Sequence, residues 1–457
     1  MNRTVFVNRI LNMKKISTIG LDMDHTLLRY HTAQFEALVF QLVIEELITN
    51  SHYPETIRAF TFHAEDAIRG LVIDSKHGNI LKLSRYGAIR QSAHGTHTIS
   101  HADQKKIYRS IYVDLGDPNY MAIDTAFSLS FCVLYSHLID LKDAHPNELP
   151  NYATIALDVL HCVDKVHADG RLKTQICQQL DRFVIKDPEL VAGIKRFIQQ
   201  GKTFFLLTNS DYYYTKILLD YAINPFLTEG ETWETLFQYT VTLANKPRFF
   251  YDQLRFLKID PSTGVMSNLL GPITPGIYQG GNAKQFTDDL SLNGDEILYI
   301  GDHIYGDILR LKKDCNWRTA LVVEELGSEI AAQKKALPIE RDIGIAMAAK
   351  MSLEEALMRL YIHKADTPPP EGPSASHLQT QISTLDQTIL SLLHKQHVFY
   401  NPRWDRIFRA GAEESYFAYQ VERYACIYME KLSDLFDHSP ITYFRAKRRL
   451  LPHDLEG

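Results

Sequence analysis

The chain of 457 residues contains few cysteines, no long apolar run and no excess of basic residues. Its five cysteines are odd in number, widely spaced and in no CxxC pair, so we expect neither a disulfide framework nor a zinc site. No apolar stretch approaches the roughly 18 residues of a membrane span, and the start lacks the compact apolar core of a signal peptide. These absences predict a cytoplasmic protein with no membrane partner.

Acidic residues outnumber basic ones, 55 against 49, which gives a formal net charge of −6. A chain without a basic field is not drawn to a phosphate backbone, so we expect no nucleic-acid partner. Apolar residues make up 45% and charged residues 23%, which is enough to bury a sizeable core. Because the chain is long for a single core, we expect several lobes or one core with large insertions.

Apolar segments alternate with helical patterns in a way that indicates a parallel sheet. Residues 16–23 (ISTIGLDM) are apolar and then turn polar, as a buried central strand does at its carboxyl end. Residues 187–201 predict a helix capped by Asp187, and the strand pattern TFFLL follows directly. The strand patterns EILYI and TALVV, with a helix from about Ile308 between them, repeat this arrangement. The alternation predicts an α/β fold with a Rossmann-like core, a parallel sheet covered by helices on both faces.

A large insertion interrupts this predicted core. Residues 34–50 carry apolar side chains at helical spacing, and residues 70–95 show short alternating runs broken by glycine, which is typical of a β-meander. The strand ends at Asp22 and Thr208 lie 186 residues apart, the difference between 208 and 22, and a crossover connection needs far fewer. We therefore expect a cap domain between them.

The last part of the chain predicts a helical extension. Residues 367–376 (TPPPEGPSAS) are rich in proline, glycine and serine and predict an exposed linker. Apolar residues recur at helical spacing from 382 to 392, and residues 414–436 predict a long amphipathic helix. The predicted domains are a catalytic core of residues 1–30 and 181–335, a cap of residues 31–180 and a helical extension of residues 336–457.

Polar residues stand at three of the predicted strand ends: DMDHT from Asp22, TNSD from Thr208 and GDHIYGD from Gly301. If the strands are neighbours in one parallel sheet, the three loops open at the same carboxyl edge. Crowded carboxylates repel one another, and a Mg²⁺ ion bound by protein carboxylates, water and a substrate phosphate relieves that repulsion. Asp22 and Asp302 are the expected ligands.

The same residues predict phosphoryl transfer. Asp22 is the candidate nucleophile, and Asp24, two residues on, can protonate the leaving oxygen and later activate water. Thr208 and Asn209 can donate to phosphoryl oxygens, and Lys246 in ANKP supplies the cation that the transition state needs. Each motif alone also fits an ordinary turn or helix start, but their order after predicted strands favours an active site.

This arrangement resembles the haloacid dehalogenase superfamily. The longer strings LDMDHTL, RGLVID, GNILK, LLTNSDYYYT, NKPRFF, ILYIGDHIYGDIL and NWRTALVV resemble the cytosolic purine 5′-nucleotidases of type II, which prefer IMP and GMP. The similarity runs from about residue 16 to the C-terminus. The resemblance implies catalytic roles for Asp22 and Asp24, phosphate binding by Thr208, Asn209, Ser210 and Lys246, and a metal site of Asp22, Asp24 and Asp302 supported by Asp307.

The resemblance also implies a base-binding group in the cap, formed by Phe127, Asp164, His167 and Lys173. An aromatic face stacks on any purine, whereas a carboxylate accepts a hydrogen bond from the ring N–H of a 6-oxopurine. The chain departs from the family near this group, with Leu160 in place of an arginine and Ala168 in place of a tyrosine. Ordinary packing on a helix face is the alternative for Phe127 and His167.

Regulation and assembly are further implications of the resemblance. The family binds nucleotide effectors at a second site and forms tetramers, so we expect a nucleoside triphosphate effector and a homo-oligomer. The matching effector positions are Tyr305, Lys313, Arg318, Gln420, Arg423 and Tyr424. The alternative for the lysine and the arginines among them is an ordinary solvated helix face.

The sequence thus predicts a Mg²⁺-dependent 5′-nucleotidase that hydrolyses purine nucleoside monophosphates of the 6-oxo type through an aspartyl-phosphate. The resemblance implies that the phosphate can also pass to a nucleoside acceptor. Two alternatives stay open: a phosphatase for another small phosphoester, and a nucleotide-sensing module without catalysis.

Overall fold

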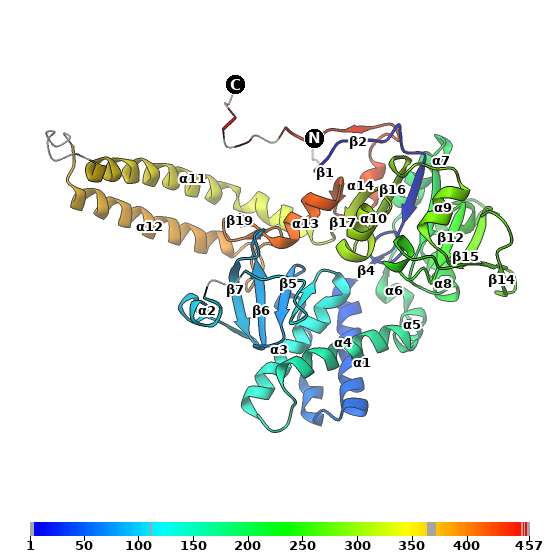
Figure 1. The fold of residues 1–457 in the computed structure, drawn as a ribbon, viewed down its shortest axis with the longest axis horizontal. Coiled ribbons are helices and arrows are strands. Elements are labelled where there is room, and N and C mark those ends of the chain that lie inside the picture. Colours follow the sequence, from blue (N-terminus) through cyan, green and yellow to red (C-terminus); the bar gives the residue numbers. More distant parts are fainter. Residues whose placement is uncertain (1–3, 110–111, 363–371, 449–450, 452, 455–457) are drawn as a thin grey trace. The chain divides into compact units, whose positions relative to one another are not determined.

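The computed structural model describes residues 4–109, 112–362, 372–448, 451 and 453–454. Its contacts divide the chain into two compact units (Figure 1). One unit comprises Met1–Glu324 with Ile407–Gly457, and the other comprises Glu325–Arg406. The finer division into a core, a cap and an extension stays a prediction.

The larger unit is built on a ten-stranded sheet in the order β1-β20-β17-β16-β3-β11-β12-β15-β13-β14. Its centre is parallel, whereas at the edges β1 pairs antiparallel with β20 and β13 pairs antiparallel with both β15 and β14. This confirms the predicted α/β class with a parallel sheet. The strands are β1 (Val5–Val7), β20 (Ile427–Met429), β17 (Arg318–Val322), β16 (Ile297–Gly301), β3 (Thr18–Leu21), β11 (Thr203–Leu207), β12 (Tyr239–Thr242), β15 (Gly276–Gly280), β13 (Phe256–Ile259) and β14 (Met266–Asn268).

The strand register brings the predicted polar loops to one edge of this sheet. Leu21 at the end of β3 pairs with Leu206 of β11 on one side and with Ile300 of β16 on the other. The three strands therefore end at the same level, and the residues that follow them emerge together. Aromatic side chains fix the strands from one face, since Phe205, Tyr299 and Trp317 are all fully buried in one core cluster.

Helices connect the parallel strands as expected. Helix α7 (Pro188–Gln199) begins after Asp187, whose side chain accepts a hydrogen bond from the Leu190 amide, and it leads into β11. Helix α8 (Tyr212–Ala222) follows β11 and begins after Asp211, whose side chain accepts from the Tyr214 amide. Helices α9 (Ala283–Asp289) and α10 (Arg310–Asp314) complete the connections.

The segment between β3 and β11 forms a second sheet with its own helices. The chain leaves through β4 (Arg29–Tyr30) and returns through β10 (Val184–Ile185), and these two strands pair antiparallel. Between them a five-stranded antiparallel sheet has the order β8-β7-β6-β5-β9, so the predicted meander is confirmed. Its elements are α1 (Thr32–Ser51), β5 (Leu71–Asp74), β6 (Asn79–Leu83), β7 (Ile89–His94), β8 (His97–Thr98), α2 (His101–Tyr108), β9 (Tyr120–Ile123), α3 (Leu129–Ala144), α4 (Tyr152–Ala168), α5 (Arg171–Gln178) and α6 (Leu180–Phe183).

The predicted helix over residues 414–436 is wrong. Helix α13 (Tyr416–Tyr424) ends early, β20 extends the central sheet beside β17, and only α14 (Ser433–Phe436) is helical beyond it. The apolar residues Ile427 and Met429 are buried as a strand, since pairing with β17 outweighs the helical spacing of the wider segment. The predicted helix after β16 also begins earlier, as the π-helix η8 (Ile304–Leu309) before α10.

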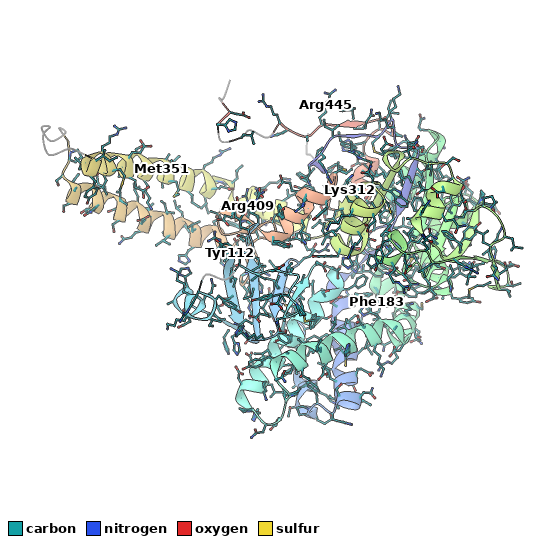
Figure 2. All side chains as sticks on the ribbon, viewed as in Figure 1. Tyr112, Phe183, Lys312, Met351, Arg409 and Arg445 are labelled. Carbon is teal, nitrogen blue, oxygen red and sulfur yellow. The ribbon has the colours of Figure 1, made fainter. Side chains whose placement is uncertain are left out.

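The smaller unit is a hairpin of two helices, α11 (Leu326–Ile362) and α12 (Ala375–His397). The ion pair between Lys350 and Asp386, with atoms 2.6 Å apart, joins the two helices. Met351 on α11 is exposed (Figure 2). Residues 367–371 of the predicted linker lie outside the described residues, and its last two residues already belong to α12. Within the described part of the chain, no helix is both long and apolar enough to cross a membrane.

Candidate active site

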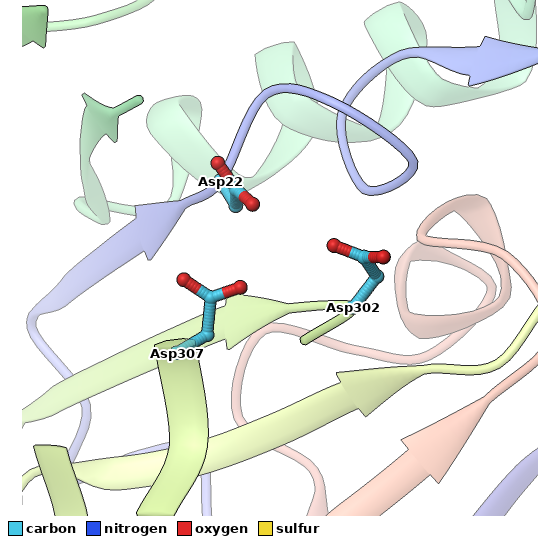
Figure 3. Close-up of side chains that lie close together, drawn as sticks. All are labelled: Asp22, Asp302 and Asp307. Atoms are coloured by element: carbon cyan, nitrogen blue, oxygen red, sulfur yellow. The ribbon is translucent and has the colours of Figure 1, made fainter. Parts of the chain in front are cut away.

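Three carboxylates meet where β3 and β16 end. Asp22 follows β3 directly and Asp302 follows β16, while Asp307 reaches back from η8. One oxygen from each lies within 4.8 Å of the others, and all three residues are buried. Figure 3 shows the three side chains facing a common space. Gly301 permits this approach, because a Cβ atom built there would lie 2.4 Å from Asp307 Oδ2.

Lys246 supplies the positive charge of the group. Its Nζ lies 2.6 Å from Asp22 Oδ1 and 2.7 Å from Asp307 Oδ1, and it donates to the Tyr299 hydroxyl at 3.1 Å. The loop after β12 carries it, and Asn209 secures this loop. The Asn209 side chain accepts from the Lys246 amide at 2.6 Å and donates to the Lys246 carbonyl at 3.1 Å. The TNSD loop and the lysine, 37 residues apart in sequence, are thus one structural unit.

Burial dominates the electrostatics of these groups. It raises the pKa of Asp22, against the opposing effect of the Lys246 ammonium. Burial likewise raises the pKa of Asp302, while His25 and Arg69 act in the opposite direction. For Lys246, burial acts to lower the pKa, but the two neighbouring carboxylates outweigh it and the pKa is raised. The lysine is therefore held in its charged form.

The donor set fits a hard divalent cation. The single positive charge of Lys246 balances one of the three negative charges that the buried carboxylates carry when ionised. Asp302 Oδ2 is buried without a hydrogen-bond partner among the described residues. A buried carboxylate oxygen that lacks a partner calls for a ligand. Carboxylate oxygens are the ligands that Mg²⁺ takes in proteins, so the chemistry of the group agrees with the predicted ion.

The side chain of Asp24 has different neighbours. Its Oδ1 accepts a hydrogen bond from the Tyr30 hydroxyl at 2.5 Å, and its Oδ2 accepts from Ser210 Oγ at 3.1 Å. It is not among the three carboxylates whose oxygens come together in the described chain. Thr208 is fully buried, and its Oγ1 accepts from the Ser210 amide at 3.0 Å. These bonds place the predicted acid beside the predicted phosphate loop.

The predicted base-binding residues lie around His167. The rings of Phe127 and His167 meet edge to face with centroids 5.6 Å apart, and Asp164 is exposed on the same helix as His167. His167 Nε2 is buried without a partner among the described residues. Burial lowers the pKa of this ring, and the charges of Asp164 and Lys173 also act on it. Lys173 pairs with Asp211 at 2.7 Å, directly after the TNS residues.

The predicted effector residues divide between two places. Tyr424 is among the groups that raise the pKa of Tyr305, after burial and Asp124, so the two rings are near each other. Arg423 lies over the ring of Tyr424, 5.4 Å from its centroid, and Gln420 is buried on the same helix. Lys313 is exposed. In the described structure no contact joins Arg318 to this group, and its guanidinium donates to the Ile10 carbonyl.

The sequence prediction missed several residues of the site. Tyr30 holds Asp24, and the buried His25 lies with Nδ1 3.6 Å from Glu324 Oε2. Arg69 is buried and donates to the Asp302 carbonyl at 3.0 Å. Arg69 opens the string RGLVID, which carries the family resemblance, so that string could have identified it. Nothing in the spacing of Tyr30 or Glu324 could have done so.

A parallel α/β sheet with a buried acidic group, a lysine and a TNSD loop at its carboxyl edge defines a phosphoryl-transfer enzyme. Comparison with known proteins identifies its family. The 5′ nucleotidase family model matches residues 5–456, and the chain belongs to this family. It is accordingly a 5′-nucleotidase-type hydrolase of phosphoric monoesters.

Individual relatives agree with this assignment. The chain is 27% identical over 459 residues to a 5′-nucleotidase domain-containing protein of Dictyostelium discoideum, covering 99% of this chain and 75% of the relative. It is 25% identical over 471 residues to 5′-nucleotidase domain-containing protein 2 of Homo sapiens, covering 98% of this chain and 85% of the relative. Among solved structures, an archaeal β-phosphoglucomutase from Pyrococcus matches with 11% identity and a TM-score of 0.30, covering 67% of this chain and 87% of that one. A similarity this low supports no inference.

Proposed function

We propose that this chain hydrolyses 6-oxopurine nucleoside 5′-monophosphates, GMP and IMP, in the cytoplasm with Mg²⁺ as its cofactor. The observation that carries the proposal is the buried group of Asp22, Asp302, Asp307 and Lys246 at the ends of adjacent parallel strands. Asp22 and Asp302 would hold the ion, with Asp307 in support. When bound, Mg²⁺ would balance the negative charge of the carboxylates and of the substrate phosphate.

In the first chemical step, Asp22 attacks phosphorus. Its Oδ1 accepts from Lys246 and from the Met23 amide, while no hydrogen bond of the described residues takes Oδ2, which is therefore the attacking atom. The bond from Asp22 to phosphorus forms as the bond to the nucleoside 5′-oxygen breaks. Asp24 gives its proton to that oxygen, and Lys246 stabilises the charge on the phosphoryl oxygens.

In the second step, Asp24 takes a proton from water as the water oxygen attacks the aspartyl-phosphate. Phosphate leaves, and the Asp22 carboxylate is restored. A nucleoside 5′-hydroxyl in place of water would accept the phosphate instead, so a nucleoside is the second partner that we propose. Thr208, Asn209 and Ser210 supply donors for the phosphoryl oxygens.

The purine would bind beside Phe127 and His167. The Phe127 ring, edge to face with the half-buried imidazole of His167, offers a flat apolar surface for stacking, and Asp164 can accept from the N–H of a 6-oxopurine. Lys173 lies nearer the phosphate loop through its pair with Asp211, which favours contact with the phosphate end of the nucleotide.

Regulation and assembly complete the proposal. The aromatic rings of Tyr305 and Tyr424 with the cation of Arg423 suit a purine triphosphate effector. Lys313 and Arg318 would contribute only if the bound nucleotide reached them. A homo-oligomer, a tetramer by family resemblance, is the proposed assembly.

A nucleotide panel tests the substrate. Phosphate release is measured from GMP, IMP, AMP, CMP and UMP, each with and without ATP or GTP. We expect the highest kcat/KM for GMP or IMP and a rise with triphosphate. Equal rates across the five nucleotides would contradict the base assignment. Release from a broader phosphoester panel, with none from nucleotides, would establish the alternative of another small substrate.

A further inference from the structure

Asp24 is held by hydroxyl groups from two separate parts of the chain. Tyr30, on β4, donates to Oδ1 at 2.5 Å, and Ser210, after β11, donates to Oδ2 at 3.1 Å. Tyr30 is only 1% exposed, so water does not replace it. An aspartate side chain ordinarily rotates about χ2, and two donors on its two oxygens fix the plane of the carboxyl group.

The tyrosine itself is rigidly placed. It pairs with Val184 of β10, at the point where the chain leaves the central sheet and returns to it. Its ring packs against His25 and Phe35, with centroids 5.0 Å and 5.1 Å away. Burial raises the pKa of Tyr30, and Asp24 and Tyr214 raise it further, so the Tyr214 side chain is also near this phenol.

The two hydrogen bonds to Asp24 differ in length. Oδ1 accepts from the buried phenol at 2.5 Å, whereas the bond from Ser210 to Oδ2 is longer, at 3.1 Å, so Oδ2 is the oxygen that can exchange a proton with a substrate. Oδ2 faces Ser210, within the TNSD loop that the proposed function assigns to the phosphate. A leaving oxygen attached to that phosphate approaches the same side of the carboxyl group.

We propose that Tyr30 is a positioning residue for Asp24, which fixes Oδ1 as an acceptor and so presents the acidic proton on Oδ2 to the leaving oxygen. The proposal rests on the proposed function, in which Asp24 is the general acid. In the first step the Oδ2 proton passes to the leaving oxygen as its bond to phosphorus breaks and the Asp22–phosphorus bond forms. In the second step Oδ2 takes a proton from water.

The effect of Tyr30→Phe on substrates with different leaving groups distinguishes a positioning role of Tyr30 from a role in the stability of the fold. An alkoxide such as the nucleoside 5′-oxygen is a poor leaving group and needs the proton, whereas 4-nitrophenolate leaves without one. The comparison uses kcat/KM, which reports the first step alone, because the second step starts from the same aspartyl-phosphate with both substrates. For the Tyr30→Phe variant we expect kcat/KM for GMP to fall about 10- to 100-fold, a fraction of the general-acid contribution. We expect kcat/KM for 4-nitrophenyl phosphate to change less than threefold.

Tyr53→Phe is the matched control. Tyr53 is 5% exposed, and its hydroxyl donates to the carboxylate of Asp158 at 2.8 Å, but it bonds to no residue of the site. The control should lose similar thermal stability and leave both kcat/KM values unchanged. An equal fall of Tyr30→Phe on both substrates, or no fall on GMP, would overturn the positioning role.

If GMP is not a substrate of the wild type, the experiment gives a different result. A wild-type enzyme that hydrolyses 4-nitrophenyl phosphate and not GMP contradicts the nucleotide assignment alone. Glycerol 1-phosphate, an alkyl ester, then replaces GMP in the same comparison, and the same selective fall supports the role of Tyr30. A wild type active on neither alkyl ester overturns the inference, because no leaving group then needs Asp24.

Discussion

Glu36 is a buried carboxyl group that forms no salt bridge among the described residues, and it makes the stability of the chain depend on pH. It lies on α1 and is fully buried. Its Oε2 accepts from the amide of Ser130, in the first turn of α3, at 2.8 Å, while its Oε1 is buried and unpaired among the described residues. Burial raises the pKa of Glu36 from 4.5 to about 7, against the opposing effect of the Ser130 donor.

The sign of the effect follows from linkage. Between pH 4.5 and about 7 the folded chain keeps the Glu36 proton while the unfolded chain releases it, so the free energy of unfolding falls as the pH rises. One pKa unit corresponds to about 1.4 kcal/mol, so the rise from 4.5 to about 7 is worth about 3 kcal/mol. Above pH 7 the effect is complete.

Replacing Glu36 by Gln removes the ionisation and keeps an oxygen for the Ser130 amide. We expect the free energy of unfolding of Glu36→Gln, relative to the wild type, to increase by up to about 3 kcal/mol between pH 5 and pH 8. Urea unfolding followed by circular dichroism at pH 5, 6, 7 and 8 measures this difference. A difference that is the same at pH 5 and pH 8 would refute the reasoning.

Glu46 on the same helix is the matched control. Burial acts to raise its pKa, but the side chains of Lys165 and Arg171 outweigh burial and lower it. Its ionised form therefore stabilises the fold. Glu46→Gln should be less stable than the wild type at pH 8, and the difference should shrink as the pH falls toward the lowered pKa, the opposite trend to Glu36→Gln.

Two other substitutions test the site and the sheet. Lys246→Met should lower kcat for phosphate release at least 100-fold, a loss like that caused by removing other electrostatic donors. The control Lys202→Met removes a buried lysine that donates to main-chain carbonyls and should not lower kcat in this way. Equal rates for the two variants would contradict the role of Lys246. Gly20→Ala should lower the free energy of unfolding by about 1–3 kcal/mol, since the new Cβ would lie 2.1 Å from Phe205 Cζ in the packed core. An unchanged melting temperature would show that the Phe205 ring can move.

The grouping of the polar residues could be predicted where chemically suitable residues stand at strand ends. Asp22, Thr208 and Asp302 each follow an apolar segment, and parallel pairing brings such positions to one edge. Lys246 was predicted from the charge that a phosphoryl-transfer site needs and from its place in the strings ANKP and NKPRFF. Asp307 could be placed because it stands five residues after Asp302 in one motif.

Other features depend on contacts that no local pattern records. Tyr30 reaches Asp24 because β4 pairs with β10, more than 150 residues away in sequence. Residues 427–429 read as part of a helix, and only their pairing with β17 makes them a strand. The contacts of the base-binding and effector residues likewise depend on tertiary packing, which spacing along the chain does not reveal.

The central claim is that Asp22 is the nucleophile of a metal-dependent 5′-nucleotidase. The most direct test is phosphate release from GMP by the wild type and by Asp22→Asn, each with Mg²⁺ and with excess EDTA. The account predicts release by the wild type with Mg²⁺ only, and none above background by a variant whose circular dichroism matches the wild type. Substantial hydrolysis by Asp22→Asn, or a wild-type rate that EDTA leaves unchanged, would contradict it.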